Sequence, residues 1–137
     1  MTDNSMQRAV RIRTDPDPYE QFLIAQAYRV GNLIFVSGQA ATTPEGEVVP
    51  GGFDAQADAV FDNLRRVLEA GGSSLEKIIK VNIYLTDMAN FPKIIELRRR
   101  YFTAPYPADT IVEVGALALP GLMIEIEAVA LVEGTVG

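Results

Sequence analysis

Apolar and polar residues alternate in two neighbouring segments near the start of the chain, at residues 25–30 and 33–37. Side chains two positions apart on a strand share a face, so this alternation is typical of strands with one buried face. Gly31 and Asn32 separate the two segments, and both residues tolerate the positive φ of a two-residue turn. The pattern therefore predicts a β-hairpin.

Three more strands are predicted further along the chain. Residues 79–85 alternate apolar with polar side chains, and the last third of the chain holds strand-like runs at roughly 110–117 and 122–132. A Leu-Pro-Gly sequence separates these last two runs and favours a turn between them. Glu125 and Glu127 lie two positions apart in the final run and therefore share one face of its strand.

Two other segments repeat apolar residues every three or four positions, which is the period of an amphipathic helix. The first segment begins at Asp54, a good N-cap, and ends at Gly71 and Gly72, which favour a helix end. The second segment follows Asp87, a further capping residue, and ends before Pro105, which cannot continue a helix. The sequence therefore predicts two helices.

The start of the chain has a different character. It is polar and contains Asp-Pro-Asp-Pro at 15–18, whose prolines exclude a regular helix. We expect an N-terminal arm over residues 1–24, with a short strand at 9–12, and one domain over residues 25–137. Residues 38–53 are rich in glycine and proline and are expected to form a loop, with a short extended piece inside it.

The order of elements is strand, strand, helix, strand, helix, strand, strand. It predicts an α+β sandwich in which a mixed sheet carries both helices on one face. The other face of the sheet also needs cover, because Ile124 and Ile126 are apolar on one alternation of the last strand, and Met123 and Val129 on the other. We therefore expect a homo-oligomer.

The composition excludes several kinds of chemistry. The chain has neither cysteine nor histidine. This excludes disulfides, thiolate nucleophiles, Ser-His-Asp arrangements and the usual zinc sites, so we expect no metal site. Any catalysis would have to use carboxylates, hydroxyls, lysine, arginine, backbone groups and water.

Charge and hydropathy make several partners poor candidates. The formal net charge of -6 opposes binding to nucleic-acid phosphates. Arg98, Arg99 and Arg100 are consecutive on a predicted helix and spread around it, which favours solvated side chains or ion pairs between subunits over an RNA site. No apolar run approaches the ~20 residues that span a bilayer. We expect no nucleic-acid or membrane partner and a cytoplasmic location.

Four ordered blocks resemble one protein family. They are VGNLIFVSGQ at 30–39, LEAGGSSL at 68–75, VNIYLTDM at 81–88 and IEIEAVA at 124–130. Together they resemble the YjgF/Rid reactive-intermediate deaminase family. The resemblance implies a chorismate-mutase-like fold and a homotrimer with ligand clefts between subunits. It also implies cofactor-free hydrolysis of imines and enamines to a carbonyl compound and ammonia.

The resemblance also assigns candidate site residues. It implies that Glu125 positions the hydrolytic water, whereas Asp109 stands where active members carry an arginine that binds the substrate carboxylate. Ile24 and Ile95 stand where many members carry a tyrosine and an asparagine. From the residues themselves, Ser37 and Gly38 end a strand where glycine allows close approach of a ligand or a neighbouring chain, and a β-bulge or turn explains them equally well.

The exchange of arginine for aspartate changes the expected substrate. A pair of unit charges at about 4 Å is worth roughly 4 kcal/mol at an effective dielectric constant near 20, so an anionic imino acid should bind badly. Asp109 near Glu125 would suit a cationic ligand or would raise the pKa of one carboxyl group.

We therefore predict a hydrolase or deaminase of a small imine or enamine that lacks the usual α-carboxylate. The alternative is a non-enzymatic trimer that binds or senses a small molecule in the same clefts. An endoribonuclease-like function ranks last because the charge of the chain is unfavourable.

Overall fold

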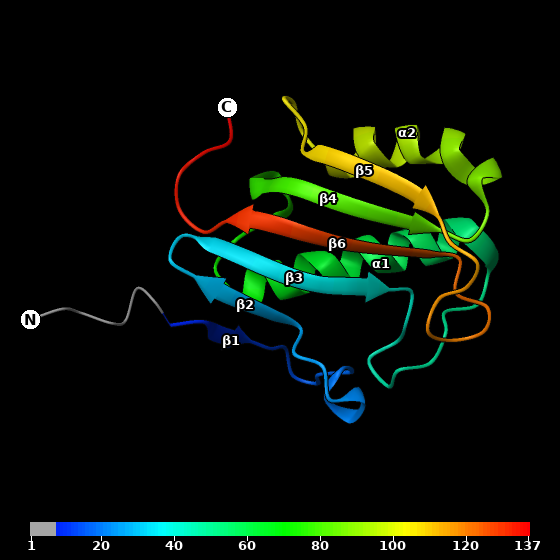
Figure 1. Cartoon of the computed structure of the whole chain (residues 1–137), viewed down its shortest axis with the longest axis horizontal. Coiled ribbons are helices and arrows are strands. Elements are labelled where there is room, and N and C mark those ends of the chain that lie inside the picture. The colour runs from blue at the N-terminus through cyan, green and yellow to red at the C-terminus, as the bar shows by residue number, and fades with distance from the viewer. Residues whose placement is uncertain (1–7) are drawn as a thin grey trace, which may run out of the picture.

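The computed structural model describes residues 8–137 and is built on a six-stranded mixed sheet with two helices on one face (Figure 1). The strands are β1 (Val10–Ile12), β2 (Ala27–Val30), β3 (Leu33–Ala40), β4 (Ile78–Leu85), β5 (Ala108–Glu113) and β6 (Ile124–Leu131). Their order across the sheet is β1-β2-β3-β6-β4-β5. Neighbouring strands are antiparallel except β4 and β5, which are parallel. The predicted α+β class and mixed sheet are confirmed.

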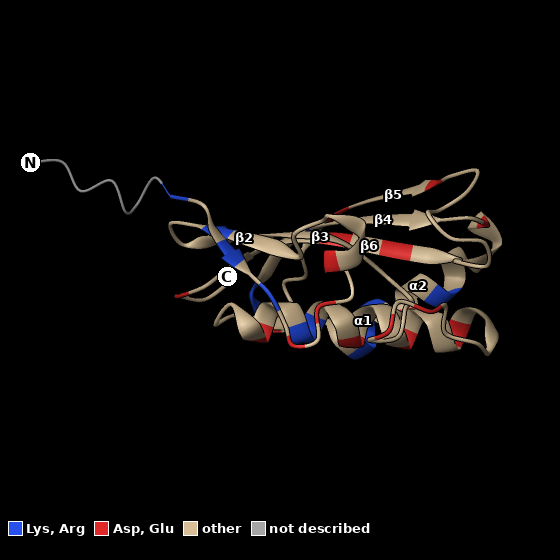
Figure 2. Cartoon of the chain, turned by 90° about the horizontal axis from the view of Figure 1, so that it is seen from below, with Lys and Arg blue, Asp and Glu red and all other residues tan. Residues whose placement is uncertain are grey.

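The helices α1 (Gly52–Ala70) and α2 (Phe91–Tyr101) lie together beneath the sheet (Figure 2). The predicted apolar stripe of α1 faces the sheet, and Phe61 is completely buried there. The ring of Phe61 stacks on Tyr101 with 4.3 Å between centroids and meets the edge of Phe102 at 5.4 Å. These contacts join α1 to the end of α2, so the two helices form one layer. Both were predicted for this face.

The helix starts differ from the prediction. Helix α1 begins at Gly52, and its N-cap is Gly51 with a φ of 109°, a value that glycine adopts readily. Asp54 is therefore in the first turn, where its negative charge favours the helix N-terminus, and not at the N-cap. Asp87 does cap a helix, but it is the short 3-10 helix Met88–Asn90 that precedes α2.

Strand β3 is longer than predicted. It continues through Ser37 and Gly38 to Ala40, and its register with β6 shifts by one residue between Val36 and Gln39. This shift is the β-bulge that the sequence left as one of two explanations. Strand β5 is shorter than predicted at its C-terminal end, and the loop region begins at 41 and not at 38. Within that loop, Thr42 and Val48 form an isolated bridge.

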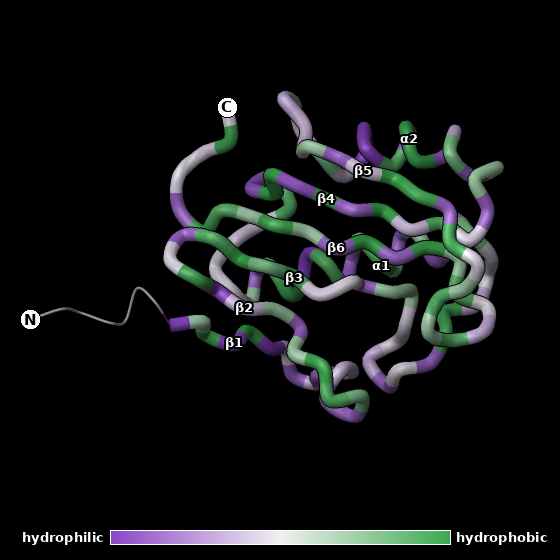
Figure 3. The backbone as a smooth tube through the Cα atoms, in the orientation of Figure 1, coloured by the Kyte–Doolittle hydropathy of each residue, from purple (hydrophilic) through white to green (hydrophobic). Residues whose placement is uncertain are grey.

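The second face of the sheet is not covered by any helix of the described chain (Figure 2). Hydrophobic residues recur along the central strands β3, β4 and β6 (Figure 3). Tyr28, Phe35 and Val112 are exposed there. An exposed apolar sheet face is typical of a surface that associates with another chain, which agrees with the predicted oligomer.

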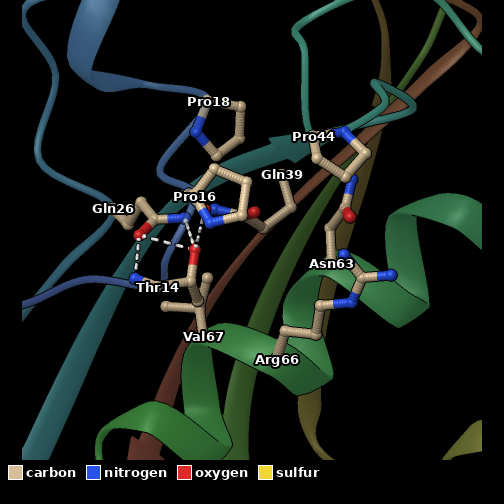
Figure 4. Close-up of a pocket in the computed structure, with 9 residues that line it drawn as sticks. All are labelled: Thr14, Pro16, Pro18, Gln26, Gln39, Pro44, Asn63, Arg66 and Val67. Carbon is tan, nitrogen blue, oxygen red and sulfur yellow. Dashed lines mark hydrogen bonds between the residues drawn. The ribbon is translucent and has the colours of Figure 1, made fainter.

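The described part of the N-terminal arm is attached to the sheet. The predicted short strand exists as β1, an edge strand that pairs with β2. Beyond it, the amide of Thr14 donates to Oε1 of Gln26 at 2.7 Å, and Nε2 of Gln26 donates to the Thr14 hydroxyl at 3.0 Å (Figure 4). The hollow beside this pair has a volume of about 20 Å³, enough for no more than a water molecule. Residues 1–7 of the predicted arm lie outside the described residues.

Candidate functional site

A cleft of about 560 Å³ opens at one end of the sheet. Its lining comes from three parts of the chain: the strap, which we define as residues 17–24, the C-terminal half of β3 with the residues after it, and β6 with the loop before it. The lining residues are Pro18, Tyr19, Phe22, Ile24, Ser37, Gly38, Ala40, Thr42, Ala118, Leu119, Leu122, Glu125 and Glu127. Four of the six predicted site residues, Ile24, Ser37, Gly38 and Glu125, are therefore together.

The β-bulge brings the backbone of β3 against the Glu125 side chain. A Cβ atom added to Gly38 would lie 2.3 Å from Oε2 of Glu125 and 2.8 Å from its carboxyl carbon. Real Cβ atoms do not approach other atoms this closely, so the glycine is needed for the carboxylate to occupy this position. The structure thus shows the bulge, and it shows that Gly38 makes room for a side chain of its own chain; the expected approach of a ligand or a neighbouring chain stays a prediction.

Glu125 and Glu127 share the open face of β6 but have different surroundings. The side-chain amide of Asn82 donates to Oε1 of Glu127 at 3.0 Å, and the hydroxyl of Tyr84 donates to the same oxygen. This hydrogen bond also raises the pKa of Tyr84. Two donors therefore hold the Glu127 side chain in one position. Asn82 and Tyr84 come from the neighbouring strand β4, opposite Glu127 and Glu125.

Glu125 is half-buried at the cleft. Burial raises the pKa of Glu125, and the neighbouring charge of Glu127 raises it further. A carboxyl group with a raised pKa is a better proton acceptor than an ordinary one, and groups of this kind are frequent in active sites. The arrangement is suited to general acid/base work on a water molecule, with Glu125 as the group that exchanges the proton.

Tyr19 fixes the strap to the cleft, and the sequence did not indicate it. Its buried hydroxyl donates to the carbonyl oxygen of Gly38 and accepts from the amide of Ala40 at 3.2 Å. Burial is the main reason that the pKa of Tyr19 rises to about 12, so the phenol is neutral at physiological pH. Tyr19 lies in a proline-containing segment without periodicity, and no pattern in that segment predicts a contact with a strand twenty residues later.

Replacing Tyr19 by phenylalanine should destabilise the protein by about 1–3 kcal/mol, because two backbone groups of β3 lose their partner. Denaturant unfolding, followed by circular dichroism, measures this change. Tyr106→Phe is the matched control, since Tyr106 is half exposed and should change stability by no more than about 0.5 kcal/mol. Equal stability of both variants would show that the Tyr19 hydroxyl does not hold the strap.

Ser37 has a structural bond as well as a place in the cleft. Its Oγ donates to the carbonyl oxygen of Ala25 at 2.6 Å, so this hydrogen bond joins β3 to the segment that precedes β2. Ile24, which stands where the family resemblance implied a tyrosine, is 47% exposed and forms part of the cleft wall. An aliphatic side chain there makes the wall apolar.

Within one chain Asp109 does not lie beside Glu125, and their expected proximity across a cleft between two subunits stays a prediction. Asp109 pairs in register with Val81, whose side chain is buried on the helix side, so Asp109 faces the helices. Glu125 pairs with Tyr84 on the open face. The two carboxylates are thus on opposite faces of the sheet, and Asp109 is not among the residues that line the cleft.

Arg98 compensates the charge of Asp109. Nε of Arg98, on α2, donates to Oδ2 of Asp109 at 3.1 Å, and both side chains are largely buried. The guanidinium also lies over the ring of Phe91, 5.8 Å from its centroid. Asp109 is therefore part of an ion pair and is not a free negative charge. Ile95, on the same helix, is 39% exposed and does not line the cleft of its own chain.

The cleft has an acidic end and apolar walls. Glu125 and Glu127 are the charged side chains that line it, and no lysine or arginine is among its lining residues. Lys80 is on the same sheet face but donates to the hydroxyl of Thr110 at 3.1 Å. Within residues 8–137, no group of three or more His, Cys, Asp or Glu side chains is placed to hold a metal ion. In that same range, no helix is long and apolar enough to cross a bilayer.

Residues 13–132 match the family described as Endoribonuclease L-PSP. The chain belongs to this family, which is the YjgF/Rid family. It is 42% identical over 106 residues to Protein HMF1 of Saccharomyces cerevisiae, covering 77% of this chain and 81% of that protein. It is 31% identical over 131 residues to the 2-iminobutanoate/2-iminopropanoate deaminase of Dermatophagoides farinae, covering 94% and 99%.

The fold agrees with solved structures of the family. The crystal structure of RidA from the Antarctic bacterium Psychrobacter superposes with a TM-score of 0.81 at 38% identity, covering 88% of this chain and 98% of that one. The family and the fold predicted from the four sequence blocks are therefore confirmed.

Proposed function

We propose that this Rid-family protein hydrolyses a small reactive imine, or an enamine through its imine tautomer, to a carbonyl compound and ammonia. The observation that supports this most directly is the half-buried carboxyl group of Glu125 at the acidic end of the cleft, with a raised pKa and with Gly38 making room for it. The relative of this chain that is named as a deaminase supports the same class of reaction.

The proposed reaction needs only water and this carboxylate. The imine reacts in its protonated iminium form. Glu125 accepts a proton from water as the water oxygen bonds to the iminium carbon, which gives a neutral carbinolamine. Glu125 then gives this proton to the amino group, the carbon–nitrogen bond breaks with loss of ammonia, and the hydroxyl proton passes to solvent water as the carbonyl forms. A positioned acid/base group of this kind typically contributes about 10²- to 10⁴-fold to the rate.

We further propose that the substrate lacks an α-carboxylate. In support, the residues lining the cleft include two carboxylates and no basic side chain. Asp109, at the family's arginine position, is bound to Arg98 on the other sheet face. We also propose that Asp109 and Ile95 contribute to the cleft of a neighbouring subunit. The proposed location of the protein is the cytoplasm.

The proposed assembly is a homotrimer with the open sheet faces inside. The exposed apolar residues of that face support an interface there. Sedimentation velocity should give one species of three times the chain mass of 14.9 kDa. A monomer at micromolar concentration would remove the basis for placing ligand clefts between subunits.

The alternative is a non-enzymatic trimer that binds a small molecule in the same cleft. It is favoured by the isoleucines at 24 and 95, because polar substrate contacts expected of active members are absent at both positions. A ribonuclease function, which the family description names, is disfavoured by the net charge of -6 and by the acidic cleft.

A semicarbazide competition assay tests the proposed function. Imines generated by an amine oxidase lack the carboxylate, whereas those generated by an amino-acid oxidase carry it. We expect faster imine consumption only with the first set. Equal inactivity on both sets would favour the binding protein. Turnover of the carboxylate-bearing set that is lost in Arg98→Ala would show instead that Arg98 has taken over carboxylate binding.

A further inference from the structure

We propose that the cleft selects an organic cation with an apolar body: an iminium or ammonium nitrogen at the Glu125 end and a hydrocarbon group between the strap and the loop before β6. This inference rests on the same site as the proposed function and names its ligand class. It does not require turnover, because recognition of the cation and the apolar body applies equally to a ligand that is only bound.

The walls of the cleft carry large apolar side chains that a hydrocarbon group of the ligand would cover. Phe22 and Ile24 of the strap are 48% and 47% exposed, although they are large hydrophobic residues. Leu119 and Leu122 line the cleft from the loop before β6. Side chains of this type gain from being covered by a hydrocarbon group, and no polar side chain of the walls offers a charged contact to compete with it.

The charges of the cleft favour a cationic ligand. The charged side chains that line the cleft are Glu125 and Glu127 of β6. The groups that face Glu125 from neighbouring elements are Tyr84 of β4 and Tyr19 of the strap, and both are phenols. A ligand cation can therefore pair with a partly desolvated carboxylate, whereas an anion would meet two negative charges without a basic partner.

The cleft is large enough for a ligand with a sizeable hydrocarbon group. Its volume of about 560 Å³ is within the range of sites that enclose whole small molecules, roughly 300–1,000 Å³. An imine with only a few carbon atoms would leave most of the apolar wall uncovered. We therefore expect affinity to rise with the size of the hydrocarbon group, from methylamine to butylamine to benzylamine.

The strap is the element that selects the hydrocarbon group of the ligand, because of its position at the cleft wall. Tyr19 ties the strap to β3 through its hydroxyl, and this tie holds Phe22 and Ile24, which follow it within five residues, at the cleft wall. Leu23, which lies between them in sequence, does not line the cleft and is 95% exposed. Phe22 and Leu23 thus form a natural pair of test position and control position.

Isothermal titration calorimetry of the full chain with stable amines tests the inference. At pH 7.5, benzylamine should bind at least tenfold more tightly than methylamine, and phenylacetate should not bind. Benzyl alcohol, which has the same body without the charge, should bind at least tenfold more weakly than benzylamine. Phe22→Ala should weaken benzylamine binding about five- to tenfold, whereas Leu23→Ala should leave it unchanged. Circular dichroism checks that both variants fold.

Two results would overturn the inference. Equal binding of benzylamine and benzyl alcohol would show that the nitrogen charge is not recognised, and equal effects of Phe22→Ala and Leu23→Ala would show that the strap does not contact the body. Failure of the proposed function gives a different pattern: benzylamine binds with this selectivity, but no imine is hydrolysed. If the inference alone fails, Glu125-dependent hydrolysis proceeds without any preference for apolar amines.

Discussion

Replacing Glu125 by glutamine is expected to lower the proposed imine hydrolysis by about 10²- to 10⁴-fold, because the proposed acceptor of the water proton is lost. Glutamine has nearly the same size, so the cleft keeps its shape. Initial rates in the semicarbazide competition assay measure this effect. Glu133→Gln is the matched control: it removes the same charge from an exposed position near the C-terminus. A wild-type rate for Glu125→Gln would mean that another group activates the water.

The same substitution should stabilise the fold at neutral pH. Burial and the charge of Glu127 raise the pKa of Glu125 in the folded state, so between its unfolded and folded pKa values the folded state holds more protons. Stability contributed by this group is therefore lost as pH rises through that window. Thermal unfolding should show Glu125→Gln to be more stable than wild type at pH 7, and the difference should shrink below pH 4.5, the ordinary pKa of glutamate.

A loss of activity together with a gain in stability separates a functional carboxylate from a structural one. If Glu125 stabilised the fold through an ion pair, neutralising it would lower the stability of the protein. Natural proteins keep destabilising groups of this kind where function requires them. Lower stability of Glu125→Gln at pH 7 would contradict the destabilising effect expected from the raised pKa of Glu125.

Replacing Gly38 by alanine should reduce hydrolysis by about 10²-fold, since a small displacement of a catalytic group has effects of this size. The added Cβ would lie 2.3 Å from Oε2 of Glu125. The atom in its way is the far end of a flexible side chain, so the carboxylate will rotate away and the backbone will stay in place. Stability should change by only about 0.5 kcal/mol.

Gly115→Ala is the matched control for Gly38→Ala. No atom lies within 4 Å of a Cβ added at Gly115, so both activity and stability should be unchanged. The measurements are initial rates and denaturant midpoints for both variants. An active Gly38→Ala would show that the Glu125 carboxylate works from a different position. A strongly destabilised Gly38→Ala would show that the bulge itself cannot accept a side chain.

The pair formed by Arg98 and Asp109 changes the meaning of the missing family arginine. The sequence comparison alone indicated a reversal of charge at Asp109, with an expected repulsion of anionic substrates. The structure shows that an arginine from α2 is in contact with that aspartate, so the pair as a whole is neutral. The two glutamates that line the cleft, and not Asp109, therefore support a substrate without a carboxylate.

The sequence by itself determined the elements and the family. Alternation and turn residues located the hairpin, and the three- to four-residue period located both helices, because burial of one face imposes these periods on any chain. The four sequence blocks identified the Rid family, and Glu125 was found through them. Helix starts were less well determined, since Gly51 can replace a side-chain cap by adopting a positive φ.

Only the tertiary structure decided which candidates meet. The one-residue shift at Ser37 and Gly38 sets the register of β3 against β6 and brings Gly38 to Glu125. The parallel pairing of β5 with β4 turns Asp109 towards the helices and Arg98. Tyr19 enters the cleft because the strap folds back on β3. Each outcome depends on pairing between segments distant in sequence, and local periodicity carries no information about such pairing.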